Sequence, residues 1–132
     1  MGFASAVRAC LAKYASIDGR ATRAEFWWFF LFQLLLMLVM GLLAAAAATW
    51  EPRAATVVGT AWGLAYLLVV PPMIAVTIRR LHDRNRSGWS YFWVLVPFVG
   101  GLIVLIWCAQ RGVEGLNRFG LDPTEPDGSF RK

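Results

Sequence analysis

The sequence predicts an all-α membrane protein with three transmembrane helices, at about 26–50, 55–78 and 89–109. Of the 132 residues, 58% are hydrophobic and the mean hydropathy is positive, which is too apolar for a soluble domain of this size. Each predicted helix is free of charged residues and has at least the roughly twenty residues that cross a hydrocarbon core of about 30 Å. We therefore expect a single integral membrane domain, residues 1–132.

The first 22 residues are expected to form a cytoplasmic amphipathic segment. Apolar residues recur at three- and four-residue spacing from Phe3 to Tyr14, with Arg8 and Lys13 between them. This pattern is typical of a short helix that lies in the membrane interface, and equally of a helix that packs on the protein itself. Residues 16–20 then break the pattern and indicate a turn.

A capping box marks the start of the first transmembrane helix. The Thr22 hydroxyl can accept a hydrogen bond from the backbone N–H of Glu25, whose side chain can reach back to the cap. The helix should therefore begin near Arg23. The apolar stretch after this cap is too long for a cleavable signal peptide, and further apolar stretches come later in the chain.

A tight polar turn at residues 51–53 predicts that the second helix returns antiparallel beside the first. Gly59 and Gly63 form a small-xxx-small pair within the second helix. Because the short turn places the two helices side by side, we expect this pair to pack against the first helix. Association of two copies through the same pair is the alternative.

Prolines interrupt the two remaining apolar stretches. Pro71-Pro72 must kink the second helix and free backbone carbonyl groups near Leu68. The stretch 89–109 is interrupted at residues 97–101. Either it continues as a kinked third span, which we favour, or it turns back as a re-entrant pair of half-helices and returns the C-terminus to its starting side.

The distribution of arginine and lysine predicts the orientation. Four cations lie in the N-terminal segment and four at residues 79–86, whereas the turn after the first helix carries only Arg53. Under the positive-inside rule, the N-terminus and the arginine-rich segment are expected to be cytoplasmic. We therefore expect the net charge of +5 to face anionic lipid headgroups and not nucleic acid. The tail, residues 110–132, is rich in glycine and proline and should be irregular.

The candidate binding site is the arginine-rich segment, whose charges could hold anionic lipid or a partner protein. A histidine within it could act as a general base, but the sequence has no second histidine, carboxylate cluster, glycine-rich phosphate loop or serine nucleophile motif. We therefore expect no catalytic residue, cofactor or metal, and interpret Cys10 and Cys108 as small hydrophobic residues. The candidate lipid- or partner-binding residues are Arg79, Arg80, His82, Asp83, Arg84, Arg86, Arg20 and Arg23.

Charged residues at the cytoplasmic ends of the first two helices should reach the same depth, because those helices are antiparallel. We expect Glu25 to divide its oxygens between the Thr22 cap and an arginine that ends the second helix. The predicted structural clamp is Thr22, Glu25 and Arg80, with Arg79 as the other possible partner. Asp83 is expected to pair with one of the same two arginines one turn back.

Three polar stretches, in this order between apolar ones, resemble the YhaH-like bacterial inner-membrane proteins, which share the domain of unknown function 805 (DUF805). The resemblance covers nearly the whole chain and implies a multi-pass inner-membrane protein without an assigned activity. The chain departs from the usual pattern at Arg84, Ser90 and Leu121. The matching stretches are Gly19–Trp28, Arg79–Asp83 with Arg86–Trp89, and Gly115 with Asn117–Gly120 and Asp122-Pro123.

The sequence thus favours a non-catalytic scaffold or accessory subunit whose arginine-rich loop binds anionic lipid or a partner, as a homo-oligomer or with another membrane protein. A small oligomeric transporter or channel is the alternative, although its helices would carry few polar side chains. An enzyme that acts on phospholipid headgroups through His82 is less favoured.

Overall fold

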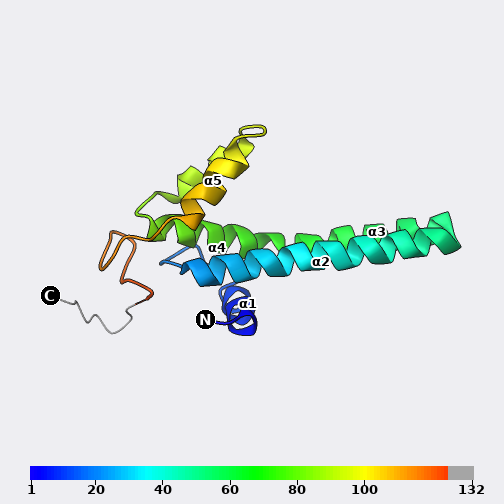
Figure 1. The fold of residues 1–132 in the computed structure, drawn as a ribbon, viewed down its shortest axis with the longest axis horizontal. Helices are drawn as coiled ribbons and strands as arrows, with labels where there is room; N and C mark the ends of the chain where they lie inside the picture. The colour runs from blue at the N-terminus through cyan, green and yellow to red at the C-terminus, as the bar shows by residue number, and fades with distance from the viewer. Residues whose placement is uncertain (125–132) are drawn as a thin grey trace.

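The computed structural model describes residues 1–124, and this part of the chain is entirely helical apart from loops and one isolated bridge between Asn117 and Gly120. The tail is irregular from Gln110 to Thr124, as predicted, and its remainder lies outside the described residues. Figure 1 shows the elements, which are α1 (Phe3–Ala12), α2 (Arg23–Trp50), α3 (Pro52–Leu67), α4 (Val70–Asp83), the 3-10 helix η1 (Gly88–Leu95) and α5 (Gly100–Ala109).

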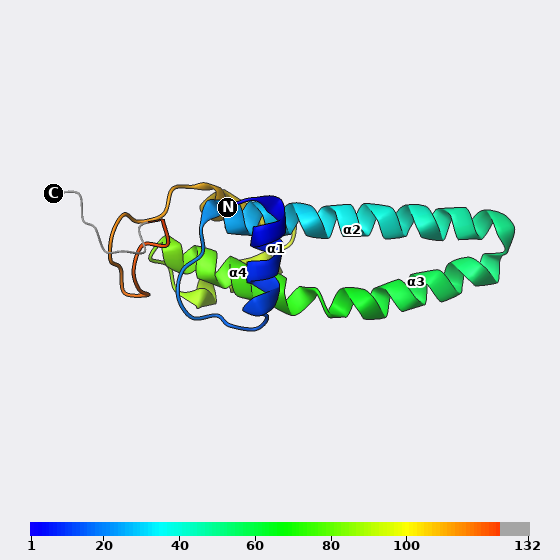
Figure 2. The same ribbon diagram turned by 90° about the horizontal axis from the view of Figure 1, so that it is seen from below.

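The molecule is built on a long antiparallel pair, with α2 on one side and α3 followed by α4 on the other (Figure 2). Helix α2 has 28 residues and is therefore about 42 Å long. Within the described residues, Arg23–Trp50 and Pro52–Asp83 are long and apolar enough to cross a membrane. These stretches match the first two predicted spans, and the turn at Glu51 makes them antiparallel as expected.

The predicted proline kink separates α3 from α4 at Leu68 and Val69. Pro72 has no N–H to donate to the Leu68 carbonyl, which instead accepts a hydrogen bond from the Tyr14 hydroxyl at 2.5 Å. The segment after α1 is thus tied to the break in the second helix, and one of the freed carbonyl groups has a partner.

The kinked third helix predicted over 89–109 does not form. The stretch forms η1, a turn at residues 96–99 and then α5, and the two arms lie against each other. A Cβ atom on Gly100 would lie only 1.6 Å from the carbonyl oxygen of Trp93. Only a residue without a side chain allows the arms to approach this closely. The shape is the re-entrant alternative that the sequence left open.

The expectation that Gly59 and Gly63 pack against the first helix is also wrong. A Cβ atom at either position would meet no heavy atom within 4 Å, and the same holds for Gly41 on α2. Helices α2 and α3 lie side by side, but these glycines are not at their contact.

Burial is concentrated at the end of the long pair where α2 begins and α4 ends. Helix α3 has no buried residue, and the buried residues of α2 all precede Leu34. Helix α1 lies across α2 and α4 (Figure 2) and buries Ala6 and Cys10, so it packs on the protein itself. The buried hydrophobic cluster comprises Cys10, Ala21, Phe26, Phe29, Val76, Val104 and Cys108.

Replacing Gly100 by alanine should force the arms of η1 and α5 apart. We expect Gly100→Ala to lower the free energy of unfolding in detergent by about 1–3 kcal/mol, the usual cost of overpacking. Gly101→Ala is the matched control, because a Cβ atom there meets nothing within 4 Å. Equal thermal stability of the two variants would show that the arms do not meet at Gly100.

Candidate functional site

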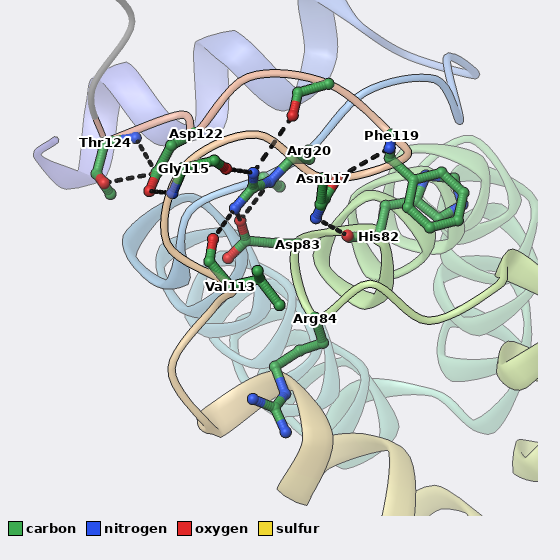
Figure 3. Close-up of polar contacts among 12 residues, drawn as sticks. Arg20, His82, Asp83, Arg84, Val113, Gly115, Asn117, Phe119, Asp122 and Thr124 are labelled. Carbon is green, nitrogen blue, oxygen red and sulfur yellow. Dashed lines mark hydrogen bonds and ion pairs between the residues drawn. The ribbon is translucent and has the colours of Figure 1, made fainter. Parts of the chain in front are cut away.

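The three polar stretches singled out in the sequence meet at the buried end of the long helix pair. We call their meeting point the polar junction and define it as Arg20, Glu25, Arg79, Arg80, His82 and Asp83 together with tail residues 113–120. The loop before α2 supplies Arg20, and the C-terminal part of α4 supplies Arg79 and Arg80. The tail passes over Arg20 and Asp83 (Figure 3).

Asp83 is the centre of the junction because it pairs with two arginines. Asp83 Oδ1 lies 2.7 Å from Arg20 Nη2 and also accepts a hydrogen bond from Arg20 Nε at 2.9 Å. Its Oδ2 accepts from Nη1 of Arg80, one turn back, as the sequence predicted. Both guanidinium side chains are 1% exposed and the carboxylate side chain is 7% exposed. Charges this sheltered must be paired and hydrogen-bonded to be stable.

Arg20 also holds the tail in place through backbone oxygens. Its Nη1 donates to the carbonyl of Gly115 at 2.5 Å, and its Nη2 donates to the carbonyl of Val113 (Figure 3). The Val113 N–H in turn donates to the Asp83 carbonyl at 2.8 Å. Since these contacts involve only tail backbone, the side chain of Arg20 acts as a spacer that fixes the path of residues 113–115.

His82 is occupied by structural contacts. Its Nδ1 is 3.1 Å from the carbonyl oxygen of Gly19, and its ring stacks on Phe119 with centroids 3.9 Å apart and planes within 3°. The Asn117 side-chain amide donates to the His82 carbonyl at 2.9 Å. Figure 3 shows the stacked rings at the edge of the junction. The arrangement ties the end of α4 to the tail.

The predicted clamp forms with a different arginine. Thr22 Oγ1 accepts from the Glu25 N–H at 3.0 Å, as expected. The Glu25 carboxylate does not reach back to the cap as predicted, and its Oε1 pairs with Arg79 Nη1 at 2.6 Å. Arg80, the predicted partner, instead donates to the carbonyl groups of Cys108 and Ala21. Consecutive residues on an α-helix point about 100° apart, so Arg79 faces α2 while its neighbour faces α5 and the tail.

The Glu25 pair lies beside α1. The Cys10 thiol is 3.7 Å from Glu25 Oε1 and donates to it. Burial and then the negative charge of Glu25 raise the pKa of this thiol to about 12, so it stays protonated. Nε and Nη2 of Arg79 are buried and have no hydrogen-bond partner among residues 1–124. Glu25 is therefore the group that compensates the Arg79 charge in this part of the chain.

The junction divides the predicted binding residues into two groups. Arg20, Arg79, Arg80, His82 and Asp83 are buried and engaged with one another or with backbone. The rest lie further out. Arg84 donates to the Arg111 carbonyl and the Gln110 side chain at 2.6 Å each, Arg86 stacks over Trp107 with its guanidinium carbon 4.1 Å from the ring centroid, and Arg23 is exposed.

Sequence reasoning missed the tail's contacts with these residues. It identified Gly115, Asn117 and Phe119 as part of a pattern but not as contacts of Arg20 and His82. A charged segment followed by a glycine-rich, irregular tail was the available signal. That signal does not show which residues are in contact, because every residue has a backbone carbonyl group and the sequence does not indicate which one accepts a hydrogen bond.

An open pocket of about 240 Å³ lies beside the junction. Three arginines and three carboxylates line it, so its formal charges balance. No group of three metal-ligating side chains occurs in residues 1–124. The lining residues are Thr22, Arg23, Arg80, Asp83, Arg111, Gly112, Val113, Glu114, Asp122 and Thr124.

Comparison with protein families matches residues 14–121 to the family described as "Protein of unknown function (DUF805)". The chain belongs to the DUF805 family. It is 39% identical over 113 residues to "Inner membrane protein YhaH" of Escherichia coli strain K12, covering 86% of this chain and 91% of that protein. It is 33% identical over 114 residues to "Inner membrane protein YhaI" of the same strain, covering 86% and 90%. No solved structure matches the chain.

The family assignment confirms the resemblance inferred from the three polar stretches. The matched region includes every residue of the polar junction. The two long apolar helices and this membership together identify the chain as a membrane protein of a YhaH-like family whose function is unknown.

The Glu25–Arg79 pair should show energetic coupling. Glu25→Gln leaves the Arg79 charge buried without compensation, so we expect the free energy of unfolding in detergent to fall by about 3–5 kcal/mol. Arg79→Gln added to Glu25→Gln should cost clearly less than the sum of the two single changes.

Two controls accompany this cycle. Arg80→Gln should be additive with Glu25→Gln, because Arg80 bonds other groups. Glu114→Gln, in the exposed part of the tail, should change stability little. Additive losses for Glu25 and Arg79 would contradict the pairing and leave Glu25 as a helix cap alone.

Gly112 should be needed for the tail to dock. A Cβ atom there would lie 2.0 Å from Asp83 Oδ2, so Gly112→Ala should displace the tail from the junction. We expect faster proteolysis of the tail and a lower melting temperature in detergent. Gly41→Ala is the control, because it makes the same substitution where no atom lies within 4 Å. Unchanged tail protection in Gly112→Ala would contradict the docked arrangement.

Proposed function

We propose that this protein is a non-catalytic scaffold or accessory subunit of the bacterial inner membrane, with a basic cytoplasmic face that binds anionic lipid or a partner protein. The observation that supports it most directly is the burial of the polar junction. The residues that resembled a reaction centre neutralise and hold one another, and they build a fixed platform at one end of the helices.

The geometry of His82 argues against catalysis. A general base needs a ring nitrogen within reach of a substrate proton. In this protein His82 is 8% exposed, one face of its ring stacks on Phe119, and Nδ1 lies at the Gly19 carbonyl. Arg79 and Arg80, which would hold a phosphoester, are buried and paired with carboxylates, so they are not open to a substrate.

The proposed topology has two membrane crossings, α2 and the α3–α4 pair, with the N-terminus in the cytoplasm. Within residues 1–124, the junction end carries nearly all the cations, whereas Arg53 is the only cation at the turn between α2 and α3, at the opposite end (Figure 2). The positive-inside rule therefore assigns the junction to the cytoplasm. The names of the relatives YhaH and YhaI support the inner membrane as its location.

Lipid binding is assigned to the arginines that the junction leaves exposed. Arg23 and Arg111 line the open pocket next to the start of α2, and both are exposed. A basic residue near an anionic leaflet contributes about 1 kcal/mol of attraction. Arg84 and Arg86 take a smaller part, because they already contact Gln110 and Trp107.

A transporter or channel is the weaker alternative. A permeation path needs polar groups that are free to face it. The Gln33 side chain instead donates to the Tyr66 hydroxyl at 2.6 Å. Thr49, Thr56 and Thr77 each donate to a carbonyl of their own helix.

Replacing Arg23 and Arg111 together by glutamine should reduce the anionic lipid that remains bound after purification. We expect a several-fold lower ratio of bound phosphatidylglycerol to protein by native mass spectrometry. Arg53→Gln, which removes a cation from the opposite end, is the control and should leave the ratio unchanged. The same spectra report subunit number and any copurifying protein.

Two results would contradict the proposal. Unchanged lipid retention in the double variant, with no copurifying protein, would remove the binding role of the basic face. Hydrolysis of a phosphoester by the purified protein that disappears in His82→Gln, while the variant keeps its melting temperature, would replace the scaffold with an enzyme.

A further inference from the structure

Helix η1, the turn at 96–99 and α5 form an apolar hairpin that diverges from the long helix pair (Figure 1). We call this element, residues 88–109, the apolar hairpin. It contains no charged residue and exposes large hydrophobic side chains along both arms. These exposed residues include Trp89, Phe92, Leu95, Phe98, Leu102 and Ile106. Such a surface needs an apolar environment.

The length of the hairpin fits one leaflet of a bilayer. Helix α5 has 10 residues and is about 15 Å long, half of the roughly 30 Å hydrocarbon core. It is too short to cross. The two ends of the hairpin lie at the polar junction. At the start of η1, a Cβ atom on Gly88 would lie 3.4 Å from His82 Nε2. At the end of α5, the Cys108 carbonyl accepts from Arg80 Nε at 3.0 Å.

Two of the three backbone N–H groups of the turn, those of Val96 and Val99, donate within the hairpin, which lowers the cost of placing the turn in hydrocarbon. Val96 N–H donates to the Trp93 carbonyl, Val99 N–H to the Pro97 carbonyl and Gly100 N–H to the Val96 carbonyl. Pro97 has no N–H to satisfy. Phe98 is fully exposed at the tip, so its ring projects away from the protein, and its backbone is left-handed with φ of 65°.

The base of the hairpin has the opposite character. Arg86 lies over the Trp107 ring, and Arg84 reaches the Gln110 side chain. Tryptophan and arginine are the residues that membrane proteins place at the headgroup level. The base therefore suits the interface, and the tip suits hydrocarbon about half a bilayer away.

We propose that the apolar hairpin inserts into a single leaflet, the cytoplasmic one, where its exposed surface contacts lipid acyl chains and its tip lies near the bilayer midplane. The residues after α5 then lie on the same side as the N-terminus. The identity of the leaflet rests on the orientation given under the proposed function, whereas half-depth insertion does not.

Sidedness of single cysteines tests the return of the chain. Ser16→Cys, Arg53→Cys and Leu121→Cys are each treated with an impermeant maleimide in right-side-out and inverted membrane vesicles. The wild-type chain sets the background, because Cys10 and Cys108 are buried. We expect Leu121→Cys to react from the same side as Ser16→Cys and from the opposite side to Arg53→Cys.

Each other outcome decides a different point. Reaction of Leu121→Cys from the Arg53 side would overturn the hairpin and establish a third span. Reaction of Ser16→Cys and Leu121→Cys from the periplasmic side would keep one-leaflet insertion, overturn the cytoplasmic assignment, and with it the orientation in the proposed function.

Depth of the tip tests what covers the hairpin. A nitroxide on Phe98→Cys in phosphatidylethanolamine and phosphatidylglycerol vesicles should collide at least several-fold more with oxygen than with a water-soluble nickel chelate. The same label on Trp89→Cys, at the base, should show the lower ratio of a headgroup position. High nickel accessibility at Phe98 would place the tip in water and overturn the proposal. Low accessibility to both reagents would overturn it too, by showing that a second copy or another protein covers the tip.

Discussion

The structure depends on one carboxylate, Asp83, which is shared by Arg20 and Arg80 in a site nearly closed to water. Each charge is stable there only because the others are present, since an uncompensated charge in such a place costs several kcal/mol. The three residues come from the loop before α2, the end of α4 and the turn of helix before it. Their pairing therefore fixes the entry of the first long helix relative to the exit of the second.

Other elements attach to this triad through backbone groups. The tail docks on Arg20 through its carbonyl oxygens, and α5 docks on Arg80 through the Cys108 carbonyl. Arginine suits this role because its planar group carries five donors in fixed directions. The arginine-rich segment, predicted from the sequence to bind lipid, thus mainly joins distant parts of the chain. The exposed arginines around it remain free for external contacts.

Away from the junction the protein makes few internal contacts. Helix α3 buries no residue, and Gly59 and Gly63 face open space. In water this would be an unstable arrangement, but lipid tails are as apolar as leucine and cover such surfaces without cost. The compact polar end is therefore suited to water and lipid headgroups. The extended apolar end and the apolar hairpin are suited to lipid tails.

The sequence by itself determined the features that local rules govern. Charge-free stretches predicted the long helices, Thr22 predicted where the first begins, and Pro72 predicted the break in the second. The tertiary structure decided the features that depend on partners distant in the chain. It assigned Glu25 to Arg79, since a rotation of about 100° separates neighbouring helix positions and a sequence pattern does not show which of them faces α2. It also turned residues 89–109 back on themselves, because a stretch of barely spanning length can satisfy its backbone either as one helix or as two short arms, and only the anchoring of both ends at the junction selects between them.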